Sequence, residues 1–198
     1  MEAVMGVLLG IGLGAACGFR IFVPLLVASI AIHGGFLTVT PEFAWLGGTP
    51  ALITLSIATL LEIAGYYLPV IDNTLDVLGA PAAVIAGTIL AAGFIGHMDP
   101  MLQWGLAAIA GGGAAGVIHG RMAAIRAAAS ATTGGLGNSA VSTAETVSAS
   151  LVSILACVLP VLAVLLLGAA IYLLVRFAIS LKRKLAQAGT PDKVEVQD

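Results

Sequence analysis

The feature that most constrains this chain is a series of five long apolar blocks. They cover residues 3–32, 50–71, 80–97, 101–118 and 148–179, and most are close to the roughly 20 residues that a helix needs to cross about 30 Å of hydrocarbon. None alternates with the period of two that a barrel strand would show. The sequence therefore predicts an all-α, polytopic membrane protein with about five or six membrane segments, some of them broken or re-entrant.

Composition and the placement of charge support this class. Hydrophobic residues make up 60% of the 198 residues and charged residues only 9%, whereas soluble domains carry about 25% charged residues. Arg20 is the only Lys or Arg in the first 120 residues, and five of the eight basic residues lie at or after Arg176. By the positive-inside rule we expect a cytoplasmic C-terminus. One transmembrane domain over 1–181 and a charged cytoplasmic tail over 182–198 are predicted.

Two sets of glycines recur at intervals of four, which places each set on one narrow face of a helix. Such faces let helix backbones approach closely in a membrane, where burial of apolar surface gives no drive toward association. We interpret both sets as helix-packing faces of the glycine-zipper kind. They are Gly6, Gly10, Gly14 and Gly18 in the first block, and Gly112, Gly116 and Gly120 in the fourth.

Prolines and repeated short patterns suggest how the blocks are organised. The first block would be about 45 Å long as one helix, too long for a bilayer unless it is tilted or broken. Helix breaks are predicted at Pro24, Pro69 and Pro160, because proline has no N–H to give to a carbonyl four residues earlier. Similar patterns at 12–16 and 111–115 suggest two repeat halves, 1–97 and 101–181, which could be inverted relative to one another.

Arg20 and Glu62 are the charges placed most firmly within apolar blocks. A charge at the centre of a spanning helix costs about 2.5 to 3.5 kcal/mol on insertion scales, so each should face protein or water and be paired. An Arg20–Glu62 ion pair is the simplest hypothesis, and Tyr66 lies on the same helix face as Glu62. The pair could fix two helices or form part of a functional site, and the sequence leaves both open.

Two further groups are candidate binding residues. Asp72 and Asp76 are four residues apart, so a helix would present both carboxylates on one face, where they could attract a cation or share a proton. The alternative is a solvated loop with an Asp cap. Residues 121–147 are small, polar and too weakly hydrophobic to face lipid. Their candidates for holding an anion or a phosphate head group are Arg121, Arg126, Thr132, Thr133 and Asn138, and the alternative is a simple linker.

Several classes of function find no support in the sequence. His33, His97 and His119 lack metal-ligand spacing, so we expect neither a metal nor a cofactor. No nucleophile motif appears, so the protein is not expected to be an enzyme. No basic patch with interleaved aromatics indicates nucleic acid. The expected partners are the lipid bilayer and an unidentified solute, ion or lipid, and the glycine faces make a homo-oligomer plausible.

Three ordered motifs carry a resemblance to a known family. GFRIFVPLL at 18–26, LEIAGYYLPVIDNTLD at 61–76 and TTGGLGN at 132–138 resemble the bacterial integral-membrane family catalogued as domain of unknown function 4126. The resemblance implies a multi-pass helical protein of the bacterial inner membrane and brings no established activity. Five residues match polar positions of the family's motifs, without assigned roles: Arg20, Glu62, Asp72, Asp76 and Asn138.

Together these features predict a small integral membrane protein that moves or binds a small solute, an ion or a lipid head group at a polar intramembrane site. A transporter of this kind would combine a broken helix, intramembrane charges and internal repeats. The alternative is a membrane scaffold or accessory subunit that transports nothing.

Overall fold

The computed structural model describes residues 2–67, 69–96, 98–134, 137–169, 172 and 176, without the side chains of residues 2, 3 and 69–77. Every regular element in these ranges is helical. The chain divides into two compact units, Met1–Val164 and Leu165–Asp198, and the described residues of the second unit are helical. The elements are α1 (Glu2–Cys17), α2 (Phe22–His33), the 3₁₀ helix η1 (Pro41–Gly47), α3 (Thr49–Gly65), α4 (Pro69–Phe94), α5 (Pro100–Ala107), the π-helical segment η2 (Ala108–Gly112), α6 (Gly113–Thr133) and α7 (Asn138–Val158), followed by a helix over Pro160–Ala169.

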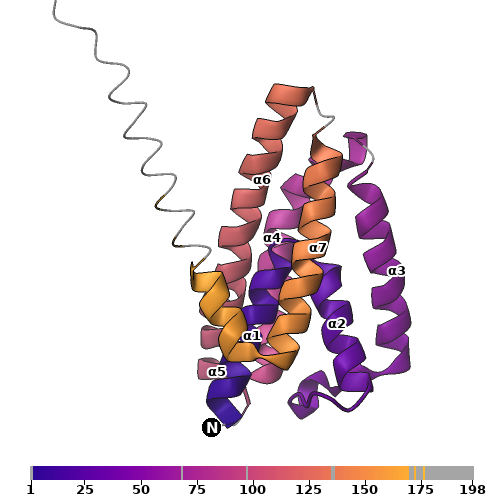
Figure 1. Cartoon of the computed structure of the whole chain (residues 1–198). Coiled ribbons are helices and arrows are strands. Elements are labelled where there is room, and N and C mark those ends of the chain that lie inside the picture. Colours follow the sequence, from indigo (N-terminus) through magenta and orange to yellow (C-terminus); the bar gives the residue numbers. More distant parts are fainter. Residues whose placement is uncertain are drawn as a thin grey trace, which may run out of the picture. The chain divides into compact units, whose positions relative to one another are not determined.

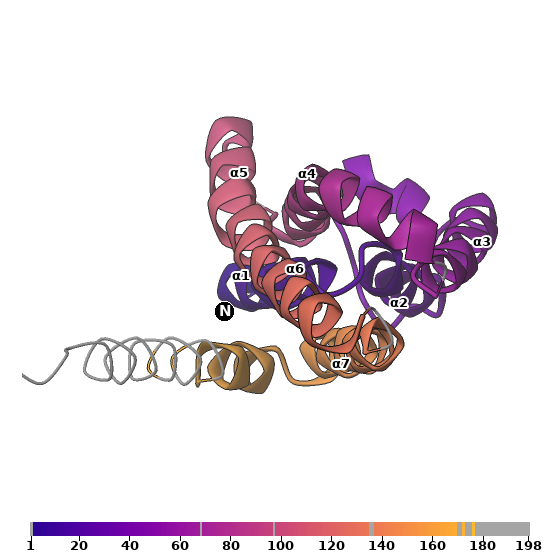
Figure 2. The ribbon, with the colours of Figure 1, turned by 90° about the horizontal axis from the view of Figure 1, so that it is seen from above.

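The first apolar block is a helical hairpin inside the first unit. α1 runs inward from the N-terminus, the chain turns at residues 18–21, and α2 returns toward the end from which α1 started (Figure 1). Seen along the bundle, α2 lies between α3 and α7, and α1 lies between α4 and α7 with α6 packed against it (Figure 2). The block is therefore broken, as expected, and its two halves pair as a hairpin with Arg20 in the turn.

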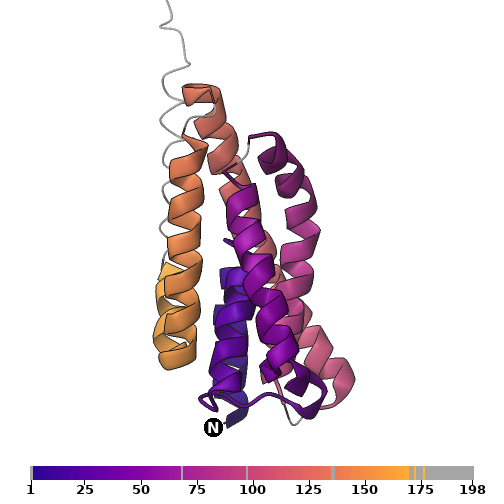
Figure 3. The same cartoon turned by 90° about the vertical axis from the view of Figure 1, so that its right-hand side faces the viewer.

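The remaining helices run along the bundle around this hairpin. The C-terminal ends of α3 and α6 lie at one end, and the N-terminus and η1 lie at the other (Figure 3). Among the residues that the structure describes, two helical stretches are long and apolar enough to cross a membrane: Pro100–Thr133, which joins α5, η2 and α6, and Asn138–Val158. η1 and α3 meet at a 62° bend, and they make a third such stretch if the two together form one span. The structure thus supports membrane-capable helices, whereas the finer count of five or six spans and the inverted repeat stay predictions.

The three prolines predicted to break helices lie at helix starts in this fold. Pro24 lies in the first turn of α2, Pro69 is the first residue of α4, and Pro160 begins the helix after α7. A helix start suits proline, because the first N–H groups of a helix have no intrahelical partner. The chain breaks before Pro24 rather than at it: N–H groups of residues 18–20 tighten the end of α1 by bonding to the carbonyls of Ala15 and Ala16.

Burial in the first unit follows the pattern of a membrane protein. Its interior is rich in small residues, among them Ala15, Ala16 and Ala28, and it also encloses several charged side chains. Many large aliphatic side chains lie outside, where they would contact lipid. On α3 these are Ile53, Ile57, Leu60 and Leu61, and on α7 they are Val147, Leu151, Ile154 and Val158.

The glycines of α1 lie where other helices approach most closely. A Cβ atom added at Gly10 would come within 2.9 Å of the Ala91 Cα atom in α4, and one added at Gly14 within 2.6 Å of the Gly111 Cα atom in η2. Gly6 faces the Phe94 carbonyl and Gly18 faces the Ala115 carbonyl in the same way. Only an absent side chain permits these contacts.

The second glycine set is less uniform. Gly112 faces Val84 and Thr88 of α4, and Gly116 faces Val84 at 3.1 Å, so both lie against a neighbouring helix. A Cβ atom at Gly120, by contrast, would meet no described atom within 4 Å. Gly112 is the last residue of the π-helical segment η2, and Gly116 and Gly120 lie in α6, so the part of this set that contacts α4 ends at Gly116.

Candidate functional site

Arg20 lies at the tip of the α1–α2 hairpin and is buried, with 1% of its surface exposed. Its Nη2 atom donates to the main-chain oxygen of Ser142 at 3.0 Å and also to the Ser142 Oγ atom. The nearest carboxylate oxygen is Oε2 of Glu145, 3.6 Å from Nη2. The N-terminal part of α7 therefore holds the guanidinium.

Glu62 has a different role from the expected one. Its Oε1 atom accepts the N–H of Ile21 at 2.7 Å, and its Oε2 atom accepts the N–H of Phe22 at 3.0 Å. Both N–H groups lie at the N-terminus of α2, where they have no partner within the helix, and the helix dipole also favours a negative charge there. The predicted Arg20–Glu62 ion pair is wrong, because both carboxylate oxygens cap α2 from α3 and Glu145 is the acid that pairs with Arg20.

A second buried arginine shares this carboxylate. Nη1 of Arg126, on α6, lies 3.0 Å from Oε2 of Glu145. Both guanidinium groups lie over the Tyr66 ring, with Cζ 3.8 Å from its centroid for Arg20 and 4.8 Å for Arg126. The aromatic face and the shared carboxylate offset the repulsion between the two cations. We call Arg20, Glu62, Tyr66, Arg126, Ser142 and Glu145 the Arg20 cluster.

Sequence reasoning missed Ser142 and Glu145. A signal was present: Ser142, Glu145, Ala149, Ser153 and Ala156 are all buried and recur at intervals of three and four. That spacing defines one face of a helix, and it is made of small and polar residues in a span whose other faces are aliphatic. Glu145 is also the only acid between Asp99 and Asp192.

His119 lacks metal-ligand spacing in the sequence, and in the structure it lies beside the Arg20 cluster. It is buried on α6, and a Cβ atom added at Gly79 would be 2.8 Å from its Cε1 atom and 3.5 Å from the Tyr66 hydroxyl. Among the residues that the structure describes, no group of three or more His, Cys, Asp and Glu side chains could hold a metal ion. His97 lies outside the described residues.

Two nitrogen atoms of Arg20 have no hydrogen-bond partner among the described residues. Nε and Nη1 are buried and make no hydrogen bond within the described part of the chain. Leaving such donors unsatisfied costs about 1–3 kcal/mol each, and more for a charged group. The tip of the hairpin therefore offers two unused donors of a cation to any acceptor that reaches it.

The other predicted site residues lie elsewhere or outside the described side chains. Thr133 accepts the Gly137 N–H at 2.8 Å, Thr132 donates to the Ala128 carbonyl, and Asn138 bonds to Ser130. They thus shape the turn between α6 and α7, where Gly134 adopts a left-handed conformation with φ of 62°. Arg121 is half-buried and takes no part in the described ion pairs of the cluster. Asp72 and Asp76 lie in α4, and their side chains are outside the described part.

The fold and this site define a class: an all-helical protein with membrane-capable helices that enclose a buried cluster of paired charges. The family model Domain of unknown function (DUF4126) matches residues 7–180. The chain belongs to this family. The match spans the cluster, the glycines of α1 after Gly6 and the turn between α6 and α7. Comparison with curated proteins and with solved structures found no match.

Proposed function

We propose that this chain is a multi-pass protein of the bacterial inner membrane, with a cytoplasmic C-terminus, that binds or moves a small hydrogen-bond acceptor at the Arg20 cluster. The observation that carries the proposal is the pair of buried, unbonded nitrogen atoms of Arg20. Arg20 is buried against α7, one of the membrane-capable helices, and an ionisable residue inside a membrane is by default a candidate site. Here part of its hydrogen-bonding capacity is unused.

The hairpin geometry supports the same proposal. Helix breaks at membrane depth are tolerated where the backbone is enclosed by protein or lines a water-filled path. Many transporters place such breaks at their substrate sites. Glu62 fixes the start of α2 through two hydrogen bonds, so the tip holds Arg20 in a defined position. A preorganised donor binds an acceptor at a lower entropic cost.

The open donors favour an anion or a neutral acceptor over a cation. The four described charges of the cluster are Arg20, Arg126, Glu62 and Glu145, which balance formally. The two acids are already committed, Glu62 to the α2 backbone and Glu145 to both arginines. A chloride or phosphate ion, or the phosphate of a lipid head group, has the required acceptors.

One observation favours the alternative, a scaffold that transports nothing. Each described interaction of the cluster joins two elements of the fold: α1–α2 to α7, α3 to α2, and α6 to α7. The pocket that the structure forms at the start of α1 is not lined by any residue of the cluster. In this alternative the charges lock the helices together.

Flux and stability measurements on the same variants distinguish these functions. The full-length chain, Arg20→Gln and Arg20→Lys are reconstituted in vesicles of phosphatidylethanolamine and phosphatidylglycerol, and the flux of chloride, inorganic phosphate and potassium is recorded. Binding predicts that chloride or phosphate raises the melting temperature of the wild type and not of Arg20→Gln. If the protein also transports the anion, vesicles with the wild type show anion flux, and vesicles with monodisperse Arg20→Gln protein do not. If no anion has either effect and Arg20→Gln changes only assembly, the scaffold alternative holds.

A further inference from the structure

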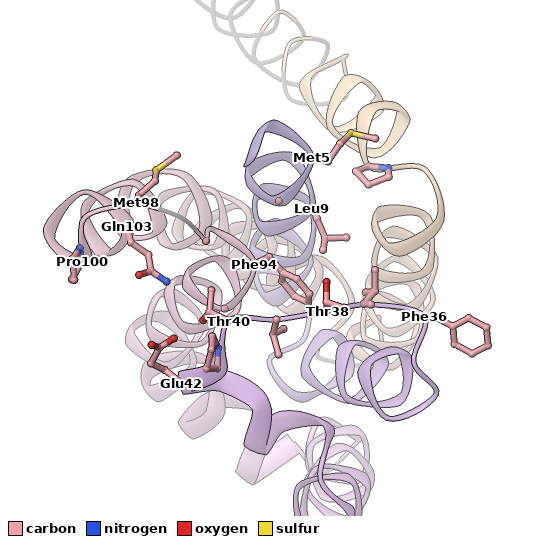
Figure 4. A pocket seen from close by; sticks show the side chains of 17 residues that line it. Met5, Leu9, Phe36, Thr38, Thr40, Glu42, Phe94, Met98, Pro100 and Gln103 are labelled. Carbon is pink, nitrogen blue, oxygen red and sulfur yellow. The ribbon is translucent and has the colours of Figure 1, made fainter. Parts of the chain in front are cut away.

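A second site lies at the other end of α1 from Arg20. It is a pocket of about 670 Å³, formed by the start of α1, residues 36–42, the end of α4, the start of α5 and Pro160 (Figure 4). Small-molecule sites typically have volumes of about 300–1,000 Å³. Nothing in the Arg20 cluster contributes to this pocket, so it is a separate feature of the fold.

The pocket has two chemically different walls. Leu9 and Phe94 form an apolar side with Met5 above them, and Thr40, Glu42 and Gln103 lie together on the other side (Figure 4). The walls therefore suit a ligand with a polar head and an apolar chain.

Hydrogen bonds hold the polar wall in place. The Thr40 N–H donates to the Gly93 carbonyl at 2.9 Å, which ties residues 36–42 to the end of α4. Gln103 Nε2 donates to the Ala92 carbonyl at 2.8 Å, which ties α5 to the same helix. The wall is thus formed before any ligand arrives, and binding need not order it.

The polar wall offers acceptors and negative charge. The Glu42 carboxylate makes no ion pair with the described residues, and the Thr40 Oγ1 atom is buried without a hydrogen-bond partner. Gln103 uses only its amide nitrogen, which leaves its amide oxygen available. The described lining contains no Lys, Arg or His. A ligand that satisfies this wall must bring N–H donors and a positive charge.

We propose that this pocket binds a primary ammonium group that carries a short apolar chain. The ammonium has three N–H donors for Glu42, Thr40 and Gln103, and the chain lies against Leu9 and Phe94. A soluble alkylamine and an amino lipid head group share this chemistry.

The chain carries its own reporter for this end of the molecule. Its two tryptophans are Trp45 and Trp104. Trp104 directly follows Gln103, and its ring lies 6.0 Å from that of Phe43, the residue after Glu42. Trp45 lies in the same 3₁₀ helix as Glu42. A ligand in the pocket should change tryptophan emission.

The test is a fluorescence titration of the full-length chain in phosphatidylcholine nanodiscs, a lipid whose quaternary head group has no N–H donor. Hexylammonium chloride should change the emission saturably, and hexanoate and hexanol should not. Glu42→Gln and Thr40→Val should each weaken the apparent affinity about tenfold, the scale of one lost charged hydrogen bond. Glu42→Asp should retain most of it, and Thr49→Val, at an exposed threonine outside the pocket, should retain all of it.

A second arm identifies the natural source of the ammonium. In nanodiscs of phosphatidylethanolamine, a lower apparent affinity for hexylammonium means that the lipid head group competes for the pocket. An unchanged affinity assigns the pocket to a soluble amine. The proposal is overturned if hexanoate binds as well as hexylammonium, if the response does not saturate, or if Glu42→Gln binds like the wild type.

Discussion

Two regions of the α1–α2 hairpin, the length of α1 and the tip, are held in place by opposite kinds of contact. Along the helix, Gly10 and Gly14 let α4 and η2 approach to backbone contact, with no charge involved. At the tip, Arg20 enters a group of charged and aromatic side chains from α3, α6 and α7. One region depends on the absence of side chains, and the other depends on long charged and aromatic side chains.

This difference shows which changes each region can tolerate. Helices in lipid gain little from burying apolar surface, so close packing and polar contacts must supply the association energy. A glycine contact is lost by adding atoms, whereas a charged contact is lost by removing one partner. The following experiments test that contrast, from the largest expected effect to the smallest.

Removing the shared carboxylate should have the largest effect. Glu145→Gln leaves two buried guanidinium groups without their common counter-ion, and breaking a buried pair costs about 3–5 kcal/mol. Thermal unfolding in detergent measures the loss. The double variant Arg126→Gln/Glu145→Gln should recover part of it, because one of the stranded cations is gone. Equal stability of Glu145→Gln and wild type would contradict the pairing described here.

Filling the glycine face should come next. Gly14→Val places a side chain where its first atom would lie 2.6 Å from the Gly111 Cα atom. Overpacking of this kind costs about 1–3 kcal/mol, and here only a backbone could yield. Gly120→Val is the matched control, since its Cβ atom would meet no described atom within 4 Å. The yield of monodisperse protein and its unfolding temperature should fall for Gly14→Val alone; similar losses in both variants would remove the contrast.

Neutralising the cap of α2 should cost less. Glu62→Gln keeps one acceptor oxygen for the Ile21 or Phe22 N–H and loses the other along with the charge, so about 1–2 kcal/mol of stability should be lost, as for other helix caps. Glu42→Gln is the control, because that carboxylate is exposed and makes no described ion pair. If the two variants have the same unfolding temperature, Glu62 does not stabilise the hairpin tip.

The smallest change is expected outside both regions. Thr133→Val removes the acceptor for the Gly137 N–H and a donor to the Ala129 carbonyl in the turn between α6 and α7. A loss of about 0.5–1.5 kcal/mol is expected for such a neutral hydrogen bond. Hydrogen exchange of Gly137 should rise locally while the unfolding temperature changes little. A global loss as large as that of Glu145→Gln would place the turn among the main determinants of the fold.

Part of this architecture could be predicted from sequence. The cost of a charge in an apolar block placed Arg20 in the interior, and the excess length of the first block predicted its break. Both arguments are local. The partner of Arg20 could not be found this way, because 122 residues separate Arg20 from Ser142 and the contact depends on how α7 is placed against the hairpin. The apolar surroundings of Glu62 predicted an ion pair, but two backbone N–H groups serve as donors to its carboxylate instead.

Residues 121–147 show a different limit. Their low hydrophobicity predicted a stretch that does not face lipid, with a simple linker as the alternative, yet its described residues form the end of α6 and the start of α7. Alanine, abundant in this stretch, is the best helix former, and polar residues are tolerated in a membrane helix when they face protein. Arg126 gives no information on orientation under the positive-inside rule. That rule concerns charges in loops, and Arg126 is a buried partner of Glu145.

The distance in sequence between the hairpin tip and α7 has a consequence for biosynthesis. At about 5–20 residues per second, Ser142 leaves the ribosome roughly 6–24 seconds after Arg20. During that interval the guanidinium has neither of its α7 contacts, and lipid is a costly environment for it. The hairpin tip therefore acquires its contacts with α7 only after the rest of its described partners have been synthesised.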